Sequence, residues 1–554
     1  MKQTKTSSLA VRLPLLIGLT LAGGIFLGAK VFSTTEANSK DDLNKNLIKM
    51  QEVLFHIQND YVDTVNINRL TDEAITKVLE NLDPHSVYIP TKEVELANTQ
   101  LEGDFDGIGV EFLIVRDTIE VVTPLSGGPS EAVGVHAGDK IVKVDGKSVA
   151  GIGITNREVF SKLRGPRNTK VVVTMKRRGE TKPIDFTITR GKIPTHSMDV
   201  AYMVDKTTGY IKINRFSATT YDEFSAGLSK LTGLGAKRLV LDLRGNPGGY
   251  MDRATRMADD FLSDGRMIVY TKSKDPVRFN QEITSTPGGK FEKGNVVVLI
   301  DEGSASASEI VSGALQDNDR ALVVGRRSFG KGLVQMPFKL SDRSELRLTI
   351  SRYYTPAGRS IQKSYEKGAK DYEMDFEKRY KGGELFNADS IKFNNALKFK
   401  TISGRTVYGG GGIMPDIFVP LDTNIAYRYM NELSNKFVIR EYALDYAEGH
   451  KAELQQAGRE AFVNNFVVTE DMMKTVIANG EKQGVKYNDA SYKKAGKNIR
   501  NLVKAFIGRS IWKEDGFFPV LNQQDEVFMT GYGLFKKAAE IEAQGQKVKS
   551  ASIR

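Results

Sequence analysis

The 554-residue sequence contains no cysteine and only five histidines. Without cysteine, the chain has no thiol nucleophile, no disulfide bond, no cysteine-bound metal and no lipoprotein attachment site. The histidines are His56, His85, His136, His196 and His450. None of them lies in the serine-containing stretch at residues 296–335. A serine nucleophile in that stretch therefore needs a different base, or a histidine that the fold brings close in space.

Long runs of one charge are also missing. The net charge is +11 and the pI is about 9.2, but the basic residues are spread along the chain and never form a run of five. No zinc-finger spacing is present. We therefore expect a solvated basic surface and no nucleic-acid partner. The length is sufficient for about two to four domains.

The N-terminal segment indicates export. Basic residues Lys2, Lys5 and Arg12 precede seventeen uncharged, mostly apolar residues at 13–29. Such a segment is typical of a secretory signal or of a single uncleaved anchor. The absence of a convincing small-x-small cleavage site favours the anchor. Residues 1–34 are therefore predicted to place the rest of the chain in the cell envelope, on the periplasmic side of the inner membrane in a double-membraned bacterium.

The stretch at residues 296–335 carries the chemistry. It opens with a β-branched run at 296–300, which predicts a buried strand, followed by a small-residue loop and a helix through about Gln316. Three serines, Ser304, Ser306 and Ser308, fall at the strand-to-helix turn, where a hydroxyl can lie beside free helix N–H groups. Lys331 is the nearby candidate base. It would need burial that lowers its pKa by about three units.

Lys331 also fits parts of two other motifs. Residues 325–331 resemble part of a phosphate-binding loop, but Gly332 replaces the required Ser or Thr and a strand-like segment follows. Ser328 and Lys331 also form a Ser-x-x-Lys pattern, but the glycines on both sides of Lys331 disfavour the helix that such a site needs. The remaining alternative is a lysine in a glycine turn and a serine-rich helix cap without catalytic function.

The spacing of these residues resembles the carboxyl-terminal processing peptidases, also called tail-specific proteases. In that family the nucleophilic serine lies 25 positions before the lysine base, and a glutamine follows four positions after the lysine. Ser306 and Lys331 are 25 positions apart (331 − 306), and Gln335 follows Lys331 by four. The resemblance therefore implies that Ser306 is the nucleophile, that Lys331 is the base, and that Gln335 orients Lys331 by hydrogen bonding.

A glycine turn supplies the second part of the resemblance. A predicted strand at 238–243 is followed by Arg-Gly-Asn-Pro-Gly-Gly at 244–249. Its backbone N–H groups are unobstructed, and the resemblance implies an oxyanion hole made by Gly248 or Gly249 together with the N–H of Ala307. The sequence leaves the choice between the two glycines open. A plain strand-to-helix turn is the alternative.

Residues 101–190 resemble a PDZ domain, which the family carries at this place. Expected strands cover 119–122 and 140–144, and expected short helices cover 130–133 and 155–163. The implied carboxylate-binding loop consists of Gly107, Ile108, Gly109 and Val110. A bound peptide would add a strand beside residues 110–112, with its terminal carboxylate in the loop.

The complete expectation is an α/β multidomain protein. It comprises a helical region at 35–100, the PDZ domain at 101–190, an α/β protease core at 191–420, which the resemblance implies is crotonase-like, and a helical extension at 421–554. Within the core, residues 363–405 are expected to form an insertion or flexible excursion. Helices are expected at about 43–61 and 70–82, and helices at either end of the chain could pair between subunits. No chemistry is assigned to the extension.

The function expected from this resemblance is an exported serine endopeptidase that cleaves proteins recognised through apolar C-terminal tails, without metal or cofactor. One alternative is a non-catalytic PDZ scaffold that holds the tails of envelope proteins, but a scaffold would not need both Ser306 and Lys331. Another alternative is a lysine-dependent amidase that acts on cell-wall peptides.

Overall fold

The computed structural model describes residues 41–125, 127–421 and 427–552. The chain divides into two units, residues 1–79 and 80–554. In the described part of the first unit, residues 41–60 are helical and α2 spans Ile67–Leu79. Both expected helices are thus confirmed, although the second ends at Leu79 instead of Leu82.

The predicted membrane segment at residues 13–29 lies outside the described residues. No helix within the described ranges is long and apolar enough to cross a membrane. The prediction of an anchor or a signal peptide therefore stays a prediction.

The region predicted as a PDZ domain is a small antiparallel sheet with two short helices. Its strands follow the order β3-β4-β5-β7-β8, with β6 paired to β5, and β2 pairs with β9, just after the predicted region, in a separate two-stranded sheet. Its elements are β2 Asp104–Gly107, β3 Val110–Val115, β4 Thr118–Pro124, α4 Pro129–Ala132, β5 Lys140–Val144, β6 Lys147–Ser148, α5 Asn156–Leu163, β7 Lys170–Lys176, β8 Ile184–Thr189 and β9 Gly191–Pro194. The expected strands and helices of this region are confirmed.

The central element is a six-stranded sheet of order β10-β11-β12-β15-β16-β21. Its strands are β10 Met198–Met203, β11 Thr208–Ile213, β12 Arg238–Asp242, β15 Asn295–Ile300, β16 Ala321–Gly325 and β21 Ile417–Phe418. All neighbouring strands are parallel except β10 and β11. Runs such as Val296–Val298 are buried on both sides, as expected of a parallel sheet covered on both faces.

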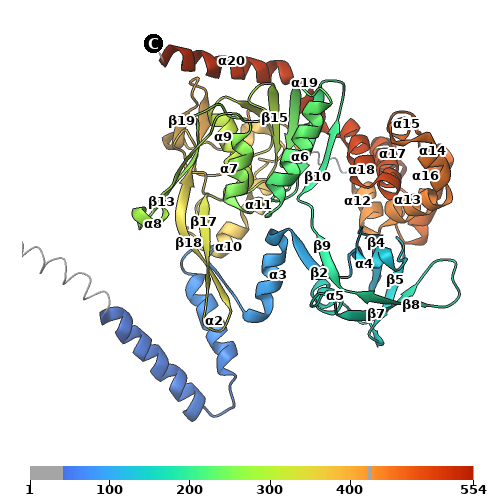
Figure 1. Cartoon of the computed structure of the whole chain (residues 1–554), viewed down its shortest axis with the longest axis horizontal. Coiled ribbons are helices and arrows are strands. Elements are labelled where there is room, and N and C mark those ends of the chain that lie inside the picture. Colours follow the sequence, from blue (N-terminus) through green and yellow to red (C-terminus); the bar gives the residue numbers. More distant parts are fainter. Residues whose placement is uncertain (1–40, 126, 422–426, 553–554) are drawn as a thin grey trace, which may run out of the picture. The chain divides into compact units, whose positions relative to one another are not determined.

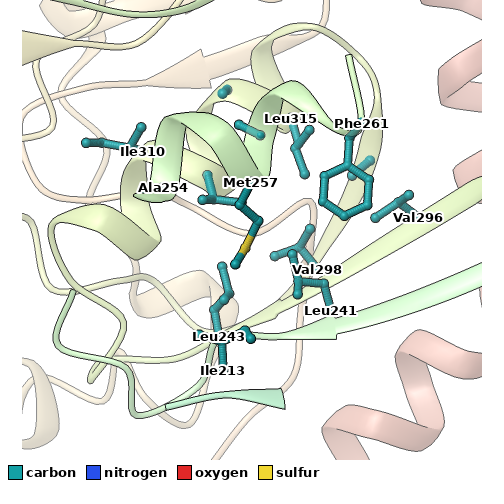
Figure 2. Close-up of a cluster of buried hydrophobic side chains, with 14 of the residues drawn as sticks. Ile213, Leu241, Leu243, Ala254, Met257, Phe261, Val296, Val298, Ile310 and Leu315 are labelled. Carbon is teal, nitrogen blue, oxygen red and sulfur yellow. The ribbon is translucent and has the colours of Figure 1, made fainter. Parts of the chain in front are cut away.

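Helices α6 (Thr220–Gly233), α7 (Met251–Asp259) and α9 (Ala307–Asp317) cover one face of this sheet. Figure 2 shows the resulting core, in which Met257 of α7 and Leu315 of α9 lie over Leu241 and Val298 of the strands. The expected strand at 296–300 and the helix after the serine turn are both confirmed. This packing fixes the start of α9, where Ser306 lies.

The opposite face of the sheet is covered by the end of the chain. Helices α18 (Glu514–Leu521), α19 (Glu526–Gly533) and α20 (Phe535–Ser552) bury apolar side chains against the strands. Gly531 in α19 lets the helix approach closely, since a Cβ there would lie 2.9 Å from the Leu299 side chain. These three helices are therefore part of the core domain.

The rest of the C-terminal extension forms its own helical cluster. Its helices are α12 Tyr427–Asn435, α13 Val438–Gly449, α14 Lys451–Ala457, α15 Arg459–Asn465, α16 Glu470–Lys482 and α17 Asp489–Trp512. They bury a separate apolar core that includes Leu433, Ile439 and Val503. The extension is helical as predicted, but its two parts bury their apolar faces in different places. Figure 1 shows the course of the chain, coloured along the sequence, with these helices in orange and red.

A second sheet carries the lysine segment. It contains β1 Val87–Ile89, β13 Met267–Ser273, β14 Glu282–Thr284, β17 Leu333–Lys339 and β18 Glu345–Tyr354. In the sequence, α3 Thr91–Glu102 follows β1, and α8 Pro276–Phe279 lies between β13 and β14. The expected hairpin ending at Tyr354 is formed by β17 and β18. Lys331 lies two residues before β17.

The segment at 363–405 folds into short elements. These are α10 Ala369–Glu373, α11 Asp375–Lys381, η1 Ala388–Ser390, η2 Asn395–Leu397 and β19 Lys398–Lys400, and β19 pairs with β20 Thr406–Tyr408. Glu384 accepts hydrogen bonds from Arg327 at 2.6 Å and from Arg379 at 2.9 Å. The segment is therefore a structured insertion fastened to the core, and the description as a flexible excursion was wrong.

Candidate active site

The three serines of the turn differ in how their hydroxyls are used. Ser304 Oγ donates to the Leu243 carbonyl at 2.8 Å, and Ser308 Oγ donates to the Asn246 carbonyl at 3.0 Å. Both of these serines are fully buried, whereas Ser306 is half-buried. Within the described chain, Ser306 Oγ donates no hydrogen bond; it lies at the N-cap of α9, beside the backbone N–H of Glu309. Ser306 is therefore the serine whose hydroxyl remains available to a substrate.

The backbone of Ser306 adopts an unusual conformation, with φ 54° and ψ −110°. Non-glycine residues rarely occupy this region, and such residues concentrate at functional sites. The conformation places Ser306 immediately before the first residue of α9, Ala307, whose N–H has no acceptor among the described residues. This agrees with the general rule that the first N–H groups of a helix lack intrahelical partners.

A buried carboxylate joins the serine and lysine segments. Glu309 Oε2 accepts hydrogen bonds from the backbone N–H of Ser306 at 2.8 Å and of Lys331 at 2.9 Å. Its Oε1 accepts from the backbone N–H of Gly330 at 2.7 Å and from Ser328 Oγ at 2.5 Å. One side chain thus brings together two segments that lie about 25 residues apart.

Neither the spacing of Ser306 and Lys331 nor the family resemblance implied a role for Glu309. Its position three residues after Ser306 is the signal that was available, because an acid at this position of a helix commonly accepts from the N-cap backbone N–H. Burial raises the pKa of Glu309 to about 7, although its four hydrogen bonds act in the opposite direction. The side chain is fully buried.

Lys331 is half-buried, and its surroundings shift its pKa. Burial lowers the pKa of its ammonium group, while the negative charges of Glu309 and Asp83 partly oppose this effect. Tyr353 fixes the backbone on both sides of the site, because its hydroxyl donates to the carbonyls of Lys331 and Ser306. Among the described residues, no hydrogen bond joins Lys331 Nζ to Ser306 Oγ. Catalytic hydrogen bonds are often long in the absence of substrate.

Gln335 makes a different contact from the one expected. Its Nε2 donates to Thr349 Oγ1 at 3.2 Å, and Thr349 Oγ1 donates to Asp83 Oδ1 at 3.0 Å. A register shift between Val334 and Gln335 sets Gln335 opposite Thr349 across the β17–β18 pair. The hydrogen bond to Lys331 that the resemblance implies is not formed between these described side chains. Gln335 is linked instead to Asp83, whose charge acts on Lys331.

The glycine turn lies directly against the serine. A Cβ added to Gly248 would lie 2.8 Å from Ser306 Cβ and 2.9 Å from the Ala307 nitrogen. Gly248 N–H donates to Asn246 Oδ1 at 2.9 Å, whereas the N–H of Gly249 has no acceptor in the described chain. Gly249 must be glycine, because it has φ 145° and a Cβ there would lie 2.0 Å from the Phe216 oxygen.

Asn246 attaches this turn to the serine turn. Its carbonyl accepts from the Ala305 N–H at 2.9 Å, and its side-chain Nδ2 donates to the Ile213 carbonyl at 3.0 Å. The residue is fully buried. The relative position of the two turns therefore depends on the conformation at Asn246.

The charge of Lys331 affects the pKa of one histidine, His85. Burial, together with the positive charge of Lys331, lowers the pKa of its imidazole to about 4. Its Nε2 lies 2.7 Å from the Tyr372 hydroxyl. His85 thus contacts the insertion and makes no hydrogen bond with Ser306 in the part of the chain that the structure describes.

The predicted carboxylate loop lies between β2 and β3. Gly107 ends β2, Ile108 is buried, Gly109 has φ 74° and Val110 begins β3. Among the described strands, β3 is an edge strand of its sheet. Phe112 of β3 contacts Phe160 of α5, with ring centroids 5.5 Å apart. A free edge beside a glycine-containing loop is the arrangement used to bind a peptide as an added strand.

Comparison with protein families agrees with this geometry. The model of peptidase family S41 matches residues 207–373, and the PDZ domain model matches residues 107–188. Residues 429–513 match a family of unknown function, DUF8443. A PDZ domain followed by such a core defines the class of protein as a PDZ-containing serine peptidase.

Individual relatives narrow this assignment. The carboxy-terminal-processing protease of Bartonella bacilliformis is 36% identical over 348 residues, which cover 61% of this chain and 78% of the relative. A "Probable CtpA-like serine protease" of Staphylococcus aureus (strain MRSA252) is 36% identical over 389 residues, or 69% of this chain and 75% of the relative. The solved photosystem II D1 C-terminal processing protease is 25% identical, with coverage of 67% and 92% and a TM-score of 0.34. The chain belongs to the carboxy-terminal-processing proteases of peptidase family S41.

Proposed function

We propose that this protein is an exported endopeptidase that uses Ser306 and Lys331 as a catalytic dyad and selects substrates by their C-terminal tails. The observation that carries the proposal is the double hydrogen bond to Glu309 Oε2, which ties the backbone N–H groups of Ser306 and Lys331 to one atom. The Ser306 hydroxyl, which donates no hydrogen bond within the described chain, and the lowered pKa of Lys331 further support it.

In the proposed reaction, Ser306 Oγ attacks the scissile carbonyl carbon while the neutral Lys331 amine accepts the hydroxyl proton. The C–N bond then breaks, and Lys331 returns the proton to the leaving amine. Water attacks the acyl-enzyme with Lys331 again acting as base, which releases the acid and restores Ser306. The proposed oxyanion donors are the N–H groups of Ala307 and Gly249, because the N–H of Gly248 is already bonded to Asn246.

Gln335 is proposed to orient Lys331. Its amide currently donates to Thr349, so direct orientation requires Gln335 to exchange Thr349 for the lysine amine. The link from Thr349 to Asp83 offers a supporting role in either state, because the Asp83 charge acts on Lys331.

Tail recognition is assigned to the PDZ domain. A substrate C-terminus with apolar residues would lie along the free edge of β3, with its carboxylate in the loop Gly107–Val110. Export rests on the apolar segment at 13–29 and leads to a site on the periplasmic side of the inner membrane. Subunit pairing is proposed through the helix at 41–60, where Leu43, Leu47 and Met50 are exposed at helical spacing.

The test uses the full chain, purified in detergent, and an unfolded protein that ends in an apolar tail. Ser306→Ala and Lys331→Ala are expected to reduce cleavage by about 10³-fold or more, because residues of a dyad act as a unit. Ser304→Ala is the matched control: it removes a hydroxyl from the same turn and should retain activity within about tenfold. Cleavage that survives Ser306→Ala would refute the proposed nucleophile.

A second substrate isolates tail recognition. The same protein with two aspartates in place of its last two apolar residues should be cleaved more slowly by the wild type, because the apolar contacts beside β3 are lost. Equal rates for both substrates would show that the tail is not selected, while leaving the dyad untouched.

A further inference from the structure

A group of four charged side chains lies beneath the glycine turn, and we call it the turn cluster: Lys212, Asp242, Arg244 and Asp525. Asp242 is fully buried and accepts from Arg244 Nη2 at 2.6 Å, while Lys212 Nζ lies 3.5 Å from its carboxylate. Arg244 Nη1 donates to both oxygens of Asp525, at 2.8 and 2.9 Å. Two cations and two carboxylates therefore balance in a site where the Arg244 side chain is only 16% exposed.

The turn cluster is joined directly to the proposed oxyanion site. Arg244 immediately precedes the glycines, and its backbone is held at both ends: its N–H donates to Asp242 Oδ1 at 3.0 Å and its carbonyl accepts from Lys212 Nζ at 3.1 Å. Two residues later, Asn246 accepts the hydrogen bond from Ala305 beside the nucleophile. A displacement of Arg244 is therefore transmitted to the turn that lies against Ser306.

Asp525 reaches this site from a distant part of the chain. It precedes α19 and caps this helix, with its Oδ1 accepting from the Phe528 N–H at 2.7 Å. The helix is held against the sheet by Phe528, whose ring lies 5.4 Å from that of Tyr210. Asp525 lies outside residues 207–373, which match the peptidase family.

We propose that Asp525 is a positioning residue of this peptidase. Its carboxylate holds Arg244, and through Arg244 it keeps the glycine turn in the conformation that presents the Gly249 N–H to the oxyanion; this inference rests on the proposed function. Without the Asp525 charge, the cluster carries an excess positive charge, and the Arg244 side chain is held by Asp242 alone. Oxyanion donors act only within a narrow distance of the developing charge, so such a shift lowers kcat.

The variant Asp525→Asn tests this role in the full chain. Asparagine caps helices as well as aspartate does, so α19 keeps its N-cap while the charge on Arg244 is lost. The matched control is Tyr532→Phe, which removes the hydrogen bond from Tyr532 to Asp205 but leaves Arg244 untouched. We expect Asp525→Asn to lower kcat about tenfold with KM within about twofold, and Tyr532→Phe to leave both within about twofold.

Hydrogen–deuterium exchange of the backbone amides at 244–250 supplies a readout that needs no catalysis. Exchange there should be faster in Asp525→Asn than in Tyr532→Phe, with equal exchange in the distant PDZ domain. If kcat and exchange of Asp525→Asn match those of Tyr532→Phe, the inference is overturned. If the wild type lacks Ser306-dependent cleavage, the proposed function fails, and the exchange measurement still decides whether Asp525 holds the turn.

Discussion

Two fully buried carboxylates flank the candidate active site and are satisfied in opposite ways. Glu309 accepts four hydrogen bonds from N–H and O–H donors and pairs with no cation among the described residues, and burial raises its pKa to about 7. Asp242 contacts Arg244 and Lys212, and these charges hold its pKa below the usual range despite complete burial. Neutral donors thus leave a buried acid close to its titration point, whereas cations in contact fix its charge.

This difference assigns the two carboxylates separate tasks. Glu309 joins the segments of Ser306 and Lys331 without adding a fixed ion pair beside the lysine. A cation paired with Glu309 would also repel the ammonium form of Lys331. Asp242 lies beside Arg244 instead, where its permanent negative charge holds Arg244 and the glycine turn that follows it.

The largest effect is expected from Glu309→Ala. Four donors lose their acceptor, and each buried donor left unsatisfied costs about 1–3 kcal/mol. Since the tie between Ser306 and Lys331 is also lost, we expect cleavage to fall by about 10²- to 10³-fold. Cleavage of the tailed substrate and the thermal unfolding midpoint measure the two consequences. Activity close to that of the wild type would mean that Glu309 does not hold the two segments.

Asp242→Asn should act first on stability. The substitution removes the negative charge that both Lys212 and Arg244 contact, and breaking a buried ion pair costs about 3–5 kcal/mol. Tyr210→Phe is the control, because it removes an uncharged donor from the same carboxylate and leaves both cations in place, with an expected cost of about 1.5–3 kcal/mol. Chemical unfolding curves compare the two variants. Equal losses would contradict the importance of the charges.

The pH dependence of stability should separate the two acids. The pKa of Glu309 is raised from 4.5 to about 7. Its contribution to the free energy of unfolding is therefore fully present below pH 4.5 and is lost as the pH rises through about 7. The pKa of Asp242 is lowered from 3.8. Its contribution to the free energy of unfolding is therefore present above pH 3.8 and is lost in stronger acid.

Glu309→Gln isolates the first of these windows, because glutamine cannot titrate. From pH 5 to 8 the wild type should lose up to about 3 kcal/mol relative to this variant. Thermal unfolding of both proteins across the range is the measurement. Parallel curves would place the titration of Glu309 outside this window.

The smallest expected effect concerns the pH profile of acylation. Since burial lowers the pKa of Lys331, acylation should rise between about pH 6 and 9 as the ammonium loses its proton. The charge of Glu309 raises the pKa of Lys331, so Glu309→Gln should move this rise to slightly lower pH, whereas Asp242→Asn should leave it in place. Pre-steady-state acylation rates report the profile. A flat wild-type profile would exclude a lysine base.

Local patterns in the sequence predicted the framework of the site. The β-branched run and small-residue turn predicted β15 and α9, and the spacing of Ser306 and Lys331 pointed to two segments that Glu309 joins. These predictions succeed because a buried strand and a helix start depend mainly on nearby residues.

Contacts between distant segments could not be predicted in the same way. That the Gly248 N–H is bonded, while the Gly249 N–H has no acceptor in the described chain, depends on the direction of the Asn246 side chain. The contact of Gln335 depends on a register shift in β17. Asp525 lies 281 positions from Arg244, and no local pattern marks it as a partner. In each case the contact depends on the direction of a side chain, and the tertiary fold sets that direction.

The cover of the central sheet by the last three helices also imposes an order on synthesis. The strands of this sheet have all been translated by residue 418, but the covering helices begin only at Glu514. A nascent chain therefore emerges with one face of its sheet still open and without the carboxylate of Asp525. The second face of the sheet can be buried only after the helices that begin at Glu514 have been synthesised. Folding of the peptidase core therefore cannot be completed before that point of translation.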